Sequence, residues 1–330
     1  MRFRHLAHGT AVALIAATAV AASAQVAPPA NPAPPADAQA QRAAAAAMPD
    51  STGTGRYPAI KEMVASLPDH VVYRPANLAA LGSHKLGILV WGNGGCSADG
   101  ASARHHLAEI ASHGYLAIAP GTIRSGPGAP PQPTAAPRAP GTAGQLPPVA
   151  TTSATLTAAI DWAYAENQRV GSPFFGKLDT GKVAVAGHSC GGLQALEVAP
   201  DPRIRAVIIN NSGVFADGSN PIPGITVTKA MLKRLHTPVL YILGGPTDIA
   251  YPNGMDDFKQ IDSVPVMVAN LDVGHGGTFG KPNGGPVATV AVDWLDWQLS
   301  GDKRAAARFT GKDCGLCTDP AWKVERKGIE

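Results

Sequence analysis

The chain has 330 residues, of which 45% are hydrophobic and 15% are charged. This composition excludes the intrinsically disordered class and predicts one folded domain of about 270 residues with a single large core. The net charge is +3, and the basic residues are scattered instead of gathered in a stripe, so we expect no nucleic-acid partner.

The N-terminus has the features of an export signal. Two arginines near Met1 precede an apolar run over residues 11–22, and Ala-Ser-Ala at residues 22–24 is a small-residue cleavage site. The apolar run has about a dozen residues, whereas a membrane span needs about 20, so a transmembrane anchor is the weaker alternative. We predict a signal peptide over residues 1–24 and a secreted or periplasmic mature protein.

Residues 25–50 consist mostly of Ala, Pro, Gln and Asn. Such a segment buries little apolar surface and does not offset the entropy lost on ordering, which predicts a flexible tether ahead of a domain at residues 51–330. After the signal, no stretch is apolar over 18 residues. We therefore expect no stable membrane insertion after cleavage, and we expect a monomer.

Short β-branched runs alternate with helical stretches from residue 71 onward. This alternation predicts an α/β fold, in which a mostly parallel sheet carries helices on both faces. The expected strands are residues 71–74, 86–91, 115–119, 182–186, 206–210, 239–243 and 266–271. The expected helices are residues 101–112, 153–168, 191–199, 228–234 and 287–299.

One connection is much longer than the others. Residues 121–150 are dominated by Pro, Gly, Ala and Thr without periodicity, and a loop of this length is usually functional or disordered. It follows an expected strand and so leaves the carboxyl edge of the sheet, where open α/β sheets bind ligands. We predict an active-site rim loop, and a surface loop without a role is the alternative.

The strongest chemical signal is Gly-His-Ser-Cys-Gly at residues 187–191. A G-x-S-x-G motif between a strand and a helix is typical of a nucleophile elbow. The turn is so tight that a Cβ at Gly187 or Gly191 would clash, and the serine is held in a strained backbone conformation. We predict Ser189 as the nucleophile, with the N-terminus of the next helix directed at the developing oxyanion.

A serine hydroxyl needs a base, and after an elbow the partners follow in the order Asp or Glu, then His. Asp248 follows the expected strand at 239–243, and His275 follows the one at 266–271. We therefore predict Asp248 as the orienting acid and His275 as the base. The competing acids are Asp256 and Asp257, in what looks like a following helix, and Asp272, on the histidine loop.

Other histidines and aromatic residues lie near these segments. His188 precedes the serine, and we expect its side chain to point away from the base position. His105 and His106 fall on an expected helix, where surface or packing roles are favoured. Three aromatic residues are candidates for lining the substrate pocket: Tyr251, Phe279 and Trp91. For Trp91, core packing is an equal alternative.

The oxyanion hole needs a second backbone donor from the loop after an earlier strand. The expected strand at 86–91 is followed by Gly-Asn-Gly-Gly-Cys, which predicts Asn93 N–H as the partner of Cys190 N–H, with Gly94 as the alternative. The loop lacks both the Gly-Lys-Ser/Thr and the G-x-G-x-x-G patterns of phosphate-binding loops.

The four cysteines of an exported chain are expected to pair. For Cys314 and Cys317, in a C-terminal extension at 301–330, a local disulfide is favoured over a redox motif and over a zinc site, which lacks a second ligand pair. Cys96 and Cys190 both fall beside the expected oxyanion hole. They either form a disulfide between the two loops or remain separate buried thiols.

These motifs resemble the α/β-hydrolase superfamily, in particular the secreted bacterial and fungal serine esterases related to dienelactone hydrolases, cutinases and polyester depolymerases. The resemblance spans roughly residues 57–300 and implies attack by Ser189, proton transfer through His275 and an acyl-enzyme. The chain differs from such polyester hydrolases by carrying Cys190 in place of methionine. It also differs from lipases, whose H-G-G-G loop is Gly-Asn-Gly-Gly here.

The favoured function is an exported serine carboxylic-ester hydrolase that acts on small, aromatic or polyester substrates. A serine peptidase of the same fold is the nearest alternative, and a non-catalytic binding protein that retains the fold is the alternative from another class. No constellation of residues supports a metal, a nucleotide or a flavin, so we expect no cofactor.

Overall fold

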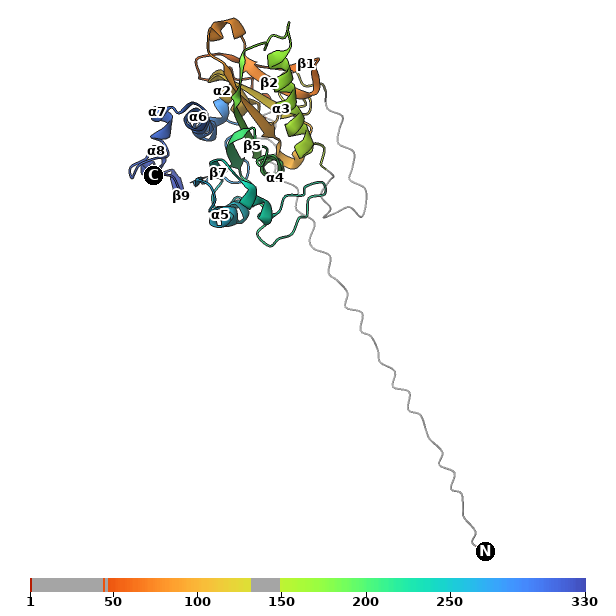
Figure 1. Ribbon diagram of the computed structural model, residues 1–330, viewed down its shortest axis with the longest axis vertical. Coiled ribbons are helices and arrows are strands. Elements are labelled where there is room, and N and C mark those ends of the chain that lie inside the picture. The colour runs from red at the N-terminus through yellow and green to blue at the C-terminus, as the bar shows by residue number, and fades with distance from the viewer. Residues whose placement is uncertain (2–43, 45–46, 132–148) are drawn as a thin grey trace. The chain divides into compact units, whose positions relative to one another are not determined.

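The sheet at the centre of this fold has nine strands, and helices cover both of its faces (Figure 1). The computed structural model describes residues 1, 44, 47–131 and 149–330. Every element described below belongs to the unit Pro34–Glu330. The expected α/β class, with a mostly parallel sheet between helical layers, is confirmed.

The strands are β1 (Ala59–Val64), β2 (Leu67–Pro75), β3 (Leu86–Gly92), β4 (Tyr115–Pro120), β5 (Leu178–His188), β6 (Ile204–Asn210), β7 (Val239–Leu243), β8 (Val266–Leu271) and β9 (Trp322–Lys327). The α-helices are α2 (Arg104–Ser112), α3 (Ser153–Gln168), α4 (Cys190–Val198), α5 (Tyr251–Gln260), α6 (Gly285–Ser300), α7 (Lys303–Ala306) and α8 (Gly315–Thr318). Short 3-10 helices are η1 (Leu78–Leu81), η2 (Gly94–Cys96), η3 (Lys229–Arg234) and η4 (Pro282–Gly284).

The order of the strands brings the expected chemistry to one edge. The strands lie in the order β1-β2-β4-β3-β5-β6-β7-β8-β9. The neighbours from β4 to β8 pair in parallel, whereas the β1–β2, β2–β4 and β8–β9 pairs are antiparallel. The loops after β3, β5, β6, β7 and β8 therefore open at the same carboxyl edge, which is where ligands bind in open α/β sheets.

All seven strands expected from the sequence are present, because each is an apolar run buried between the helical layers. The two edge strands, β1 and β9, were not expected from the sequence. Their sequences, Ala-Ile-Lys-Glu-Met-Val and Trp-Lys-Val-Glu-Arg-Lys, interrupt the apolar pattern with charges. Charged side chains are common on edge strands, where they oppose pairing with another chain.

Two pairs of helices sandwich the sheet. Helices α3 and α4 cover one face, where Leu156, Ile160 and Leu193 join its core cluster. Helices α2 and α6 cover the other face, where Leu107 and Trp294 are buried. Figure 1 shows α3 and the α2–α6 pair on opposite sides of the strands. The expected helices at 101–112, 153–168, 191–199 and 287–299 are therefore confirmed, whereas the one at 228–234 is the 3-10 helix η3.

The predicted signal peptide at 1–24 lies outside the described residues except for Met1, as does most of the predicted tether at 25–50. The end of that tether contacts the domain. The carbonyl of Met48 accepts a hydrogen bond from Arg104 Nη2 at 2.9 Å, and the Asp50 carboxylate pairs with Lys61 and with Arg104. Across the residues that the structure describes, none of the helices has the length and apolarity to span a membrane.

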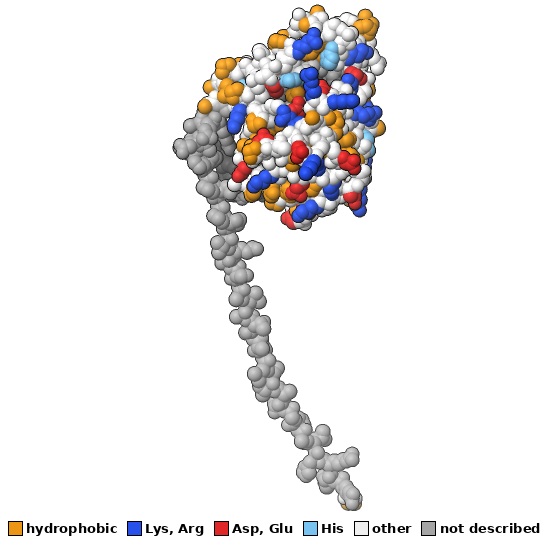
Figure 2. Space-filling model, turned by 90° about the vertical axis from the view of Figure 1, so that its left-hand side faces the viewer, with side chains coloured by type: hydrophobic (Ala, Val, Ile, Leu, Met, Phe, Trp, Pro, Cys, Tyr) orange, Lys and Arg blue, Asp and Glu red, His pale blue; other side chains and the backbone are white. Residues whose placement is uncertain are grey.

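Charged side chains of both signs are interspersed on the face shown in Figure 2. Lys and Arg side chains lie beside Asp and Glu side chains over this face, without a continuous basic stripe. This face therefore lacks the single-sign surface by which proteins contact nucleic acid.

Two disulfides account for all four cysteines. Cys96 on η2 pairs with Cys190 at the start of α4, and Cys314 pairs with Cys317. The prediction of a local Cys314–Cys317 bond is confirmed. For Cys96 and Cys190, which the sequence left open, the disulfide is the alternative that the structure contains.

The two disulfides are expected to differ in their effect on stability. A cross-link restricts the unfolded chain more when it closes a longer loop, and the sequence separations are 94 and 3 residues. Replacing both Cys96 and Cys190 by alanine is expected to lower the free energy of unfolding by about 4 kcal/mol. The matched double variant Cys314→Ala/Cys317→Ala is expected to lose about 2 kcal/mol, as measured by urea unfolding. An equal or larger loss in the second variant would contradict this ranking.

Candidate active site

Ser189 sits on a sharp turn between β5 and α4. Its backbone φ is 54°, a left-handed conformation that a residue with a side chain rarely adopts. A Cβ on Gly187 would lie 2.2 Å from the carbonyl oxygen of Gly191, and a Cβ on Gly191 would lie 2.1 Å from the Gly92 carbonyl. The predicted strain at the serine and the predicted need for both glycines are confirmed.

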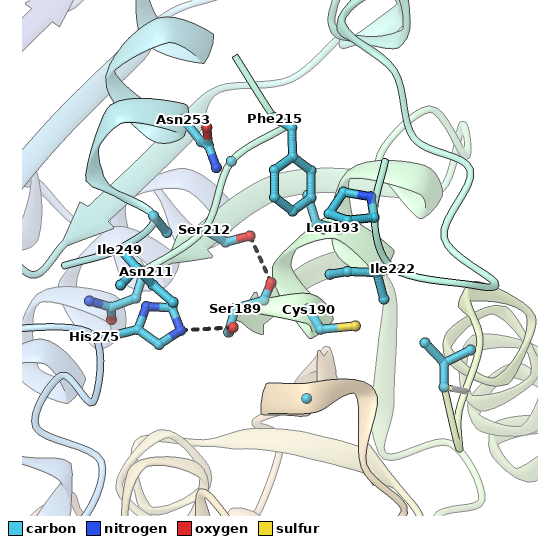
Figure 3. A pocket seen from close by; sticks show the side chains of 15 residues that line it. Ser189, Cys190, Leu193, Asn211, Ser212, Phe215, Ile222, Ile249, Asn253 and His275 are labelled. Carbon is cyan, nitrogen blue, oxygen red and sulfur yellow. Dashed lines mark hydrogen bonds between the residues drawn. The ribbon is translucent and has the colours of Figure 1, made fainter. Parts of the chain in front are cut away.

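His275 links Ser189 to Asp248. Its Nε2 lies 2.9 Å from Ser189 Oγ, and its Nδ1 lies 2.6 Å from Asp248 Oδ1. Figure 3 shows the imidazole directed at the serine hydroxyl, with Ile249 and Asn211 beside it. The three side chains follow β5, β7 and β8, so the parallel sheet brings together residues that are up to 86 positions apart.

The competing acids have other partners. Asp256 and Asp257, on α5, both pair with Lys229, and Asp257 is fully buried. Asp272 lies on the histidine loop, where it accepts a hydrogen bond of 3.5 Å from Thr247. Asp248 is thus the one of these four carboxylates that the structure places against His275.

Asp248 is buried, but its carboxylate accepts several hydrogen bonds from protein donors. Burial by itself raises the pKa of this carboxyl group. Hydrogen bonds from His275, from the N–H groups of Ala250 and Gly244 and from Asn211 outweigh burial and lower its pKa from 3.8 to about 2. Asp248 is therefore ionised at neutral pH and accepts the proton of His275 Nδ1.

Acid is expected to remove stability through Asp248. Because the pKa of Asp248 is lower in the folded chain, its contribution is fully present above about pH 4 and is lost as the pH falls toward 2. The shift corresponds to about 2 kcal/mol of unfolding free energy. Urea unfolding between pH 5 and pH 2.5 is expected to show a steeper loss for the native chain than for Asp248→Asn. Equal slopes for the two proteins would contradict the prediction.

Two polar residues after β6 complete this constellation, and the sequence analysis missed both. Asn211 donates from Nδ2 to Asp248 Oδ2 at 2.8 Å and to the Gly274 carbonyl at 3.1 Å. Ser212 donates from Oγ to the Ser189 carbonyl at 2.7 Å (Figure 3). The sequence feature that could have indicated these residues is the turn sequence Asn-Ser-Gly directly after a buried strand. In the structure, Asn211 adopts a positive φ of 47°.

The other histidines pack beside the site. His188 Nε2 hydrogen-bonds the carbonyl of His275 at 2.8 Å, and its ring lies 5.3 Å from the His275 ring, so it packs against the base residue instead of pointing away from it. His105 and His106 on α2 are both buried, which favours the packing alternative over the surface one. Burial lowers the pKa of His106 to about 3 and that of His188 to about 4, so both rings are neutral at pH 7.

The loop after β3 lies against the elbow. Asn93 is fully buried, and its Nδ2 donates to the carbonyls of Ser97 at 2.9 Å and Pro120 at 2.7 Å, which holds the loop in place. Gly95 is the loop residue that lines the pocket together with Ser189 and Cys190. The assignment of Asn93 N–H, Cys190 N–H or Gly94 N–H to an oxyanion stays a prediction, and Gly95 joins these candidates.

A cavity of about 340 Å³ opens in front of Ser189. Figure 3 shows Leu193, Phe215 and Ile222 around the serine. Apolar side chains form most of the wall: Val149, Leu193, Phe215, Ile222, Ile249 and Ala250. The cavity therefore suits an uncharged apolar group.

The predicted rim loop contributes to this cavity. Residues 132–148 of the segment lie outside the described residues, but Val149 lines the cavity. The next two N–H groups, of Ala150 and Thr151, both donate to the Cys96 carbonyl at 3.0 Å. The end of the segment is thus fixed to the same loop that the Cys96–Cys190 disulfide joins to α4.

The three aromatic candidates for the pocket separate in space. Tyr251, the first residue of α5, is partly buried and packs against the core cluster. Trp91 and Phe279 line a second cavity, which shares Gly95 as a wall with the cavity at Ser189. Trp91 is fully buried, so it serves both core packing and a cavity wall.

A scan against protein-family models gives no match, and a search of curated protein sequences gives none either. Within the described ranges, no group of three or more His, Cys, Asp or Glu side chains is arranged to hold a metal ion.

Proposed function

We propose that this chain is an exported serine hydrolase of the α/β-hydrolase type, which cleaves carboxylic esters through an acyl-enzyme. The observation that carries the proposal is the hydrogen-bonded series Asp248–His275–Ser189, with the strained serine facing an apolar cavity. Nucleophile, base and orienting acid each have the contact that their role requires. Export is supported by the two disulfides.

Proton transfer follows from the tautomer of His275. An ionised Asp248 only accepts hydrogen bonds, so Nδ1 of His275 carries the proton and Nε2 offers its lone pair to Ser189 Oγ–H. As Oγ bonds to the ester carbon, His275 takes the serine proton and Asp248 stabilises the imidazolium. His275 then gives that proton to the leaving alcohol as the carbon–oxygen bond breaks, and water repeats the cycle on the acyl-enzyme.

The tetrahedral intermediate carries a negative oxygen that needs donors. An α-helix leaves its first N–H groups without partners inside the helix, and α4 begins at Cys190, directly after the nucleophile. Cys190 N–H and one N–H from residues 93–95 form the proposed oxyanion hole. The Cys96–Cys190 disulfide joins the two loops that supply these donors and limits their relative motion.

The substrate class follows from the lining of the cavity. An apolar wall around Ser189 accommodates a short aliphatic or an aromatic acyl group and offers no charged partner for a charged one. We therefore propose small, aromatic or polyester substrates.

Labelling with a biotinylated fluorophosphonate tests the reaction class. The purified protein is expected to take up one equivalent of probe on the peptide that contains Ser189, and Ser189→Ala is expected to take up none. Ser219→Ala, which removes an exposed serine, is the matched control and is expected to label like the native chain. A native protein that neither labels nor hydrolyses a short-chain chromogenic ester would favour the non-catalytic alternative.

A further inference from the structure

A second cavity, of about 720 Å³, adjoins the proposed active site. It shares Gly95 with the cavity at Ser189, and Gly276, the residue after His275, forms another part of its wall. Its other principal side chains come from β3, the end of the segment before α2, β5 and the loop after β8: Trp91, Ser102, His188 and Phe279. The two cavities therefore meet at Gly95, and the second begins beside His275.

The wall of this second cavity is aromatic. The ring of Phe279 lies 5.6 Å from that of Trp91, at an interplanar angle of 64°, and 4.9 Å from that of His188, at 56°. His106 packs behind them, 5.1 Å from both Trp91 and Phe279. Tilted and edge-to-face rings at these distances attract one another, and a further ring inserted among them would gain the same contacts.

The cavity is also uncharged. His188 donates from Nε2 to the carbonyl of His275, and because burial keeps this imidazole neutral, its Nδ1 remains an acceptor. The wall contains no Asp, Glu, Lys or Arg among the described residues. The buried indole N–H of Trp91 has no hydrogen-bond acceptor within the described part of the chain. An oxygen atom on a neutral aromatic ligand would supply the acceptor that this N–H lacks.

The direction of the reaction assigns the two cavities. His275 must hand its proton to the leaving alcohol, so that half of the ester lies on the His275 side of the serine. Ser189 and His275 both line the apolar cavity. Gly276, the residue after His275, lines the aromatic cavity, so this cavity begins beside the base. We infer that the second cavity binds the aromatic leaving alcohol of the ester, while the acyl group occupies the cavity at Ser189.

This inference rests on the proposed ester hydrolysis, and a matched ester series tests the two separately. Ethyl and benzyl butyrate share the acyl group and differ only in the leaving alcohol. Neither alcohol is an activated leaving group. With the alcohol held constant, ethyl butyrate and ethyl phenylacetate differ only in the acyl group. Ser102 is an exposed residue of the cavity wall, so Ser102→Phe adds a ring to this wall and narrows the cavity. Ser102→Ala at the same position leaves the cavity open.

The readout is a ratio of kcat/KM values. In Ser102→Phe the benzyl-to-ethyl ratio is expected to fall about tenfold below that of the native chain, since the added ring competes with the benzyl ring for contacts in the cavity, while Ser102→Ala keeps the native ratio. An unchanged benzyl-to-ethyl ratio in a Ser102→Phe protein with a native melting temperature would overturn the inference. A fall in kcat/KM for ethyl phenylacetate alone would also overturn the inference, because it would place the acyl group in this cavity.

Direct binding covers the case in which no ester is cleaved. If no ester is cleaved, the proposed function fails, and the binding of benzyl alcohol itself then tests the cavity. Saturation-transfer NMR is expected to show benzyl alcohol bound to Ser189→Ala and to the native chain but not to Ser102→Phe. Binding that Ser102→Phe leaves intact would place the alcohol elsewhere and would overturn the assignment of this cavity.

Discussion

Replacing Ser189 by alanine is expected to lower kcat for a short-chain chromogenic ester by about 10⁶-fold. The substitution removes the hydroxyl that lies 2.9 Å from His275 Nε2, and with it the proposed acyl-enzyme route. The residual rate is expected to come from the oxyanion donors and from substrate binding, which stay in place. The measurement is the initial rate of ester hydrolysis at saturating substrate, with folding checked by thermal unfolding.

Ser212→Ala is an informative comparison for this result. Ser212 donates to the Ser189 carbonyl and makes no contact with the serine hydroxyl, so its loss should affect the turn without removing the nucleophile. We expect a fall in kcat far smaller than that of Ser189→Ala. Equal losses in both variants, or full activity in Ser189→Ala, would refute the assignment of the nucleophile.

Replacing Asp248 by asparagine is expected to lower kcat by about 10⁴-fold. An amide presents an N–H₂ group where the carboxylate accepts the Nδ1 proton of His275, so the imidazole would move its proton to Nε2 and lose its function as a base. The three further donors to Asp248, from Asn211, Gly244 and Ala250, fit a carboxylate better than an amide. The measurement is kcat across neutral pH for both proteins.

Asp272→Asn is the matched control for Asp248. The substitution makes the same change of charge on the histidine loop. Among the described residues, the Asp272 side chain has one hydrogen bond, which it accepts from the Thr247 hydroxyl. We expect its kcat to stay within about twofold of the native value, in line with most surface substitutions. A large loss in Asp272→Asn together with an active Asp248→Asn would reassign the orienting acid.

Much of the fold was predictable because its signals are local. The apolar β-branched runs of β3 to β8 and the apolar stripe of α3 depend on residues only a few positions apart. The elbow motif is local too, since a Cβ on Gly187 would clash with Gly191 four positions on, although the clash at Gly191 is with Gly92 on another strand. The edge strands β1 and β9 were missed because charged side chains interrupt their apolar patterns, and for β9 the pairing strand β8 also lies far away in the chain.

The sequence by itself determined the fold class and singled out Ser189 and His275, because motif, chain order and strand ends point to them. Only the tertiary structure decided between Asp248 and the nearby acids, paired Cys96 with Cys190, and brought in Asn211 and His188. It also showed that Trp91 and Phe279 line a separate cavity. The physical reason is that these choices depend on contacts between loops from different strands, and such contacts follow from the path of the backbone in space.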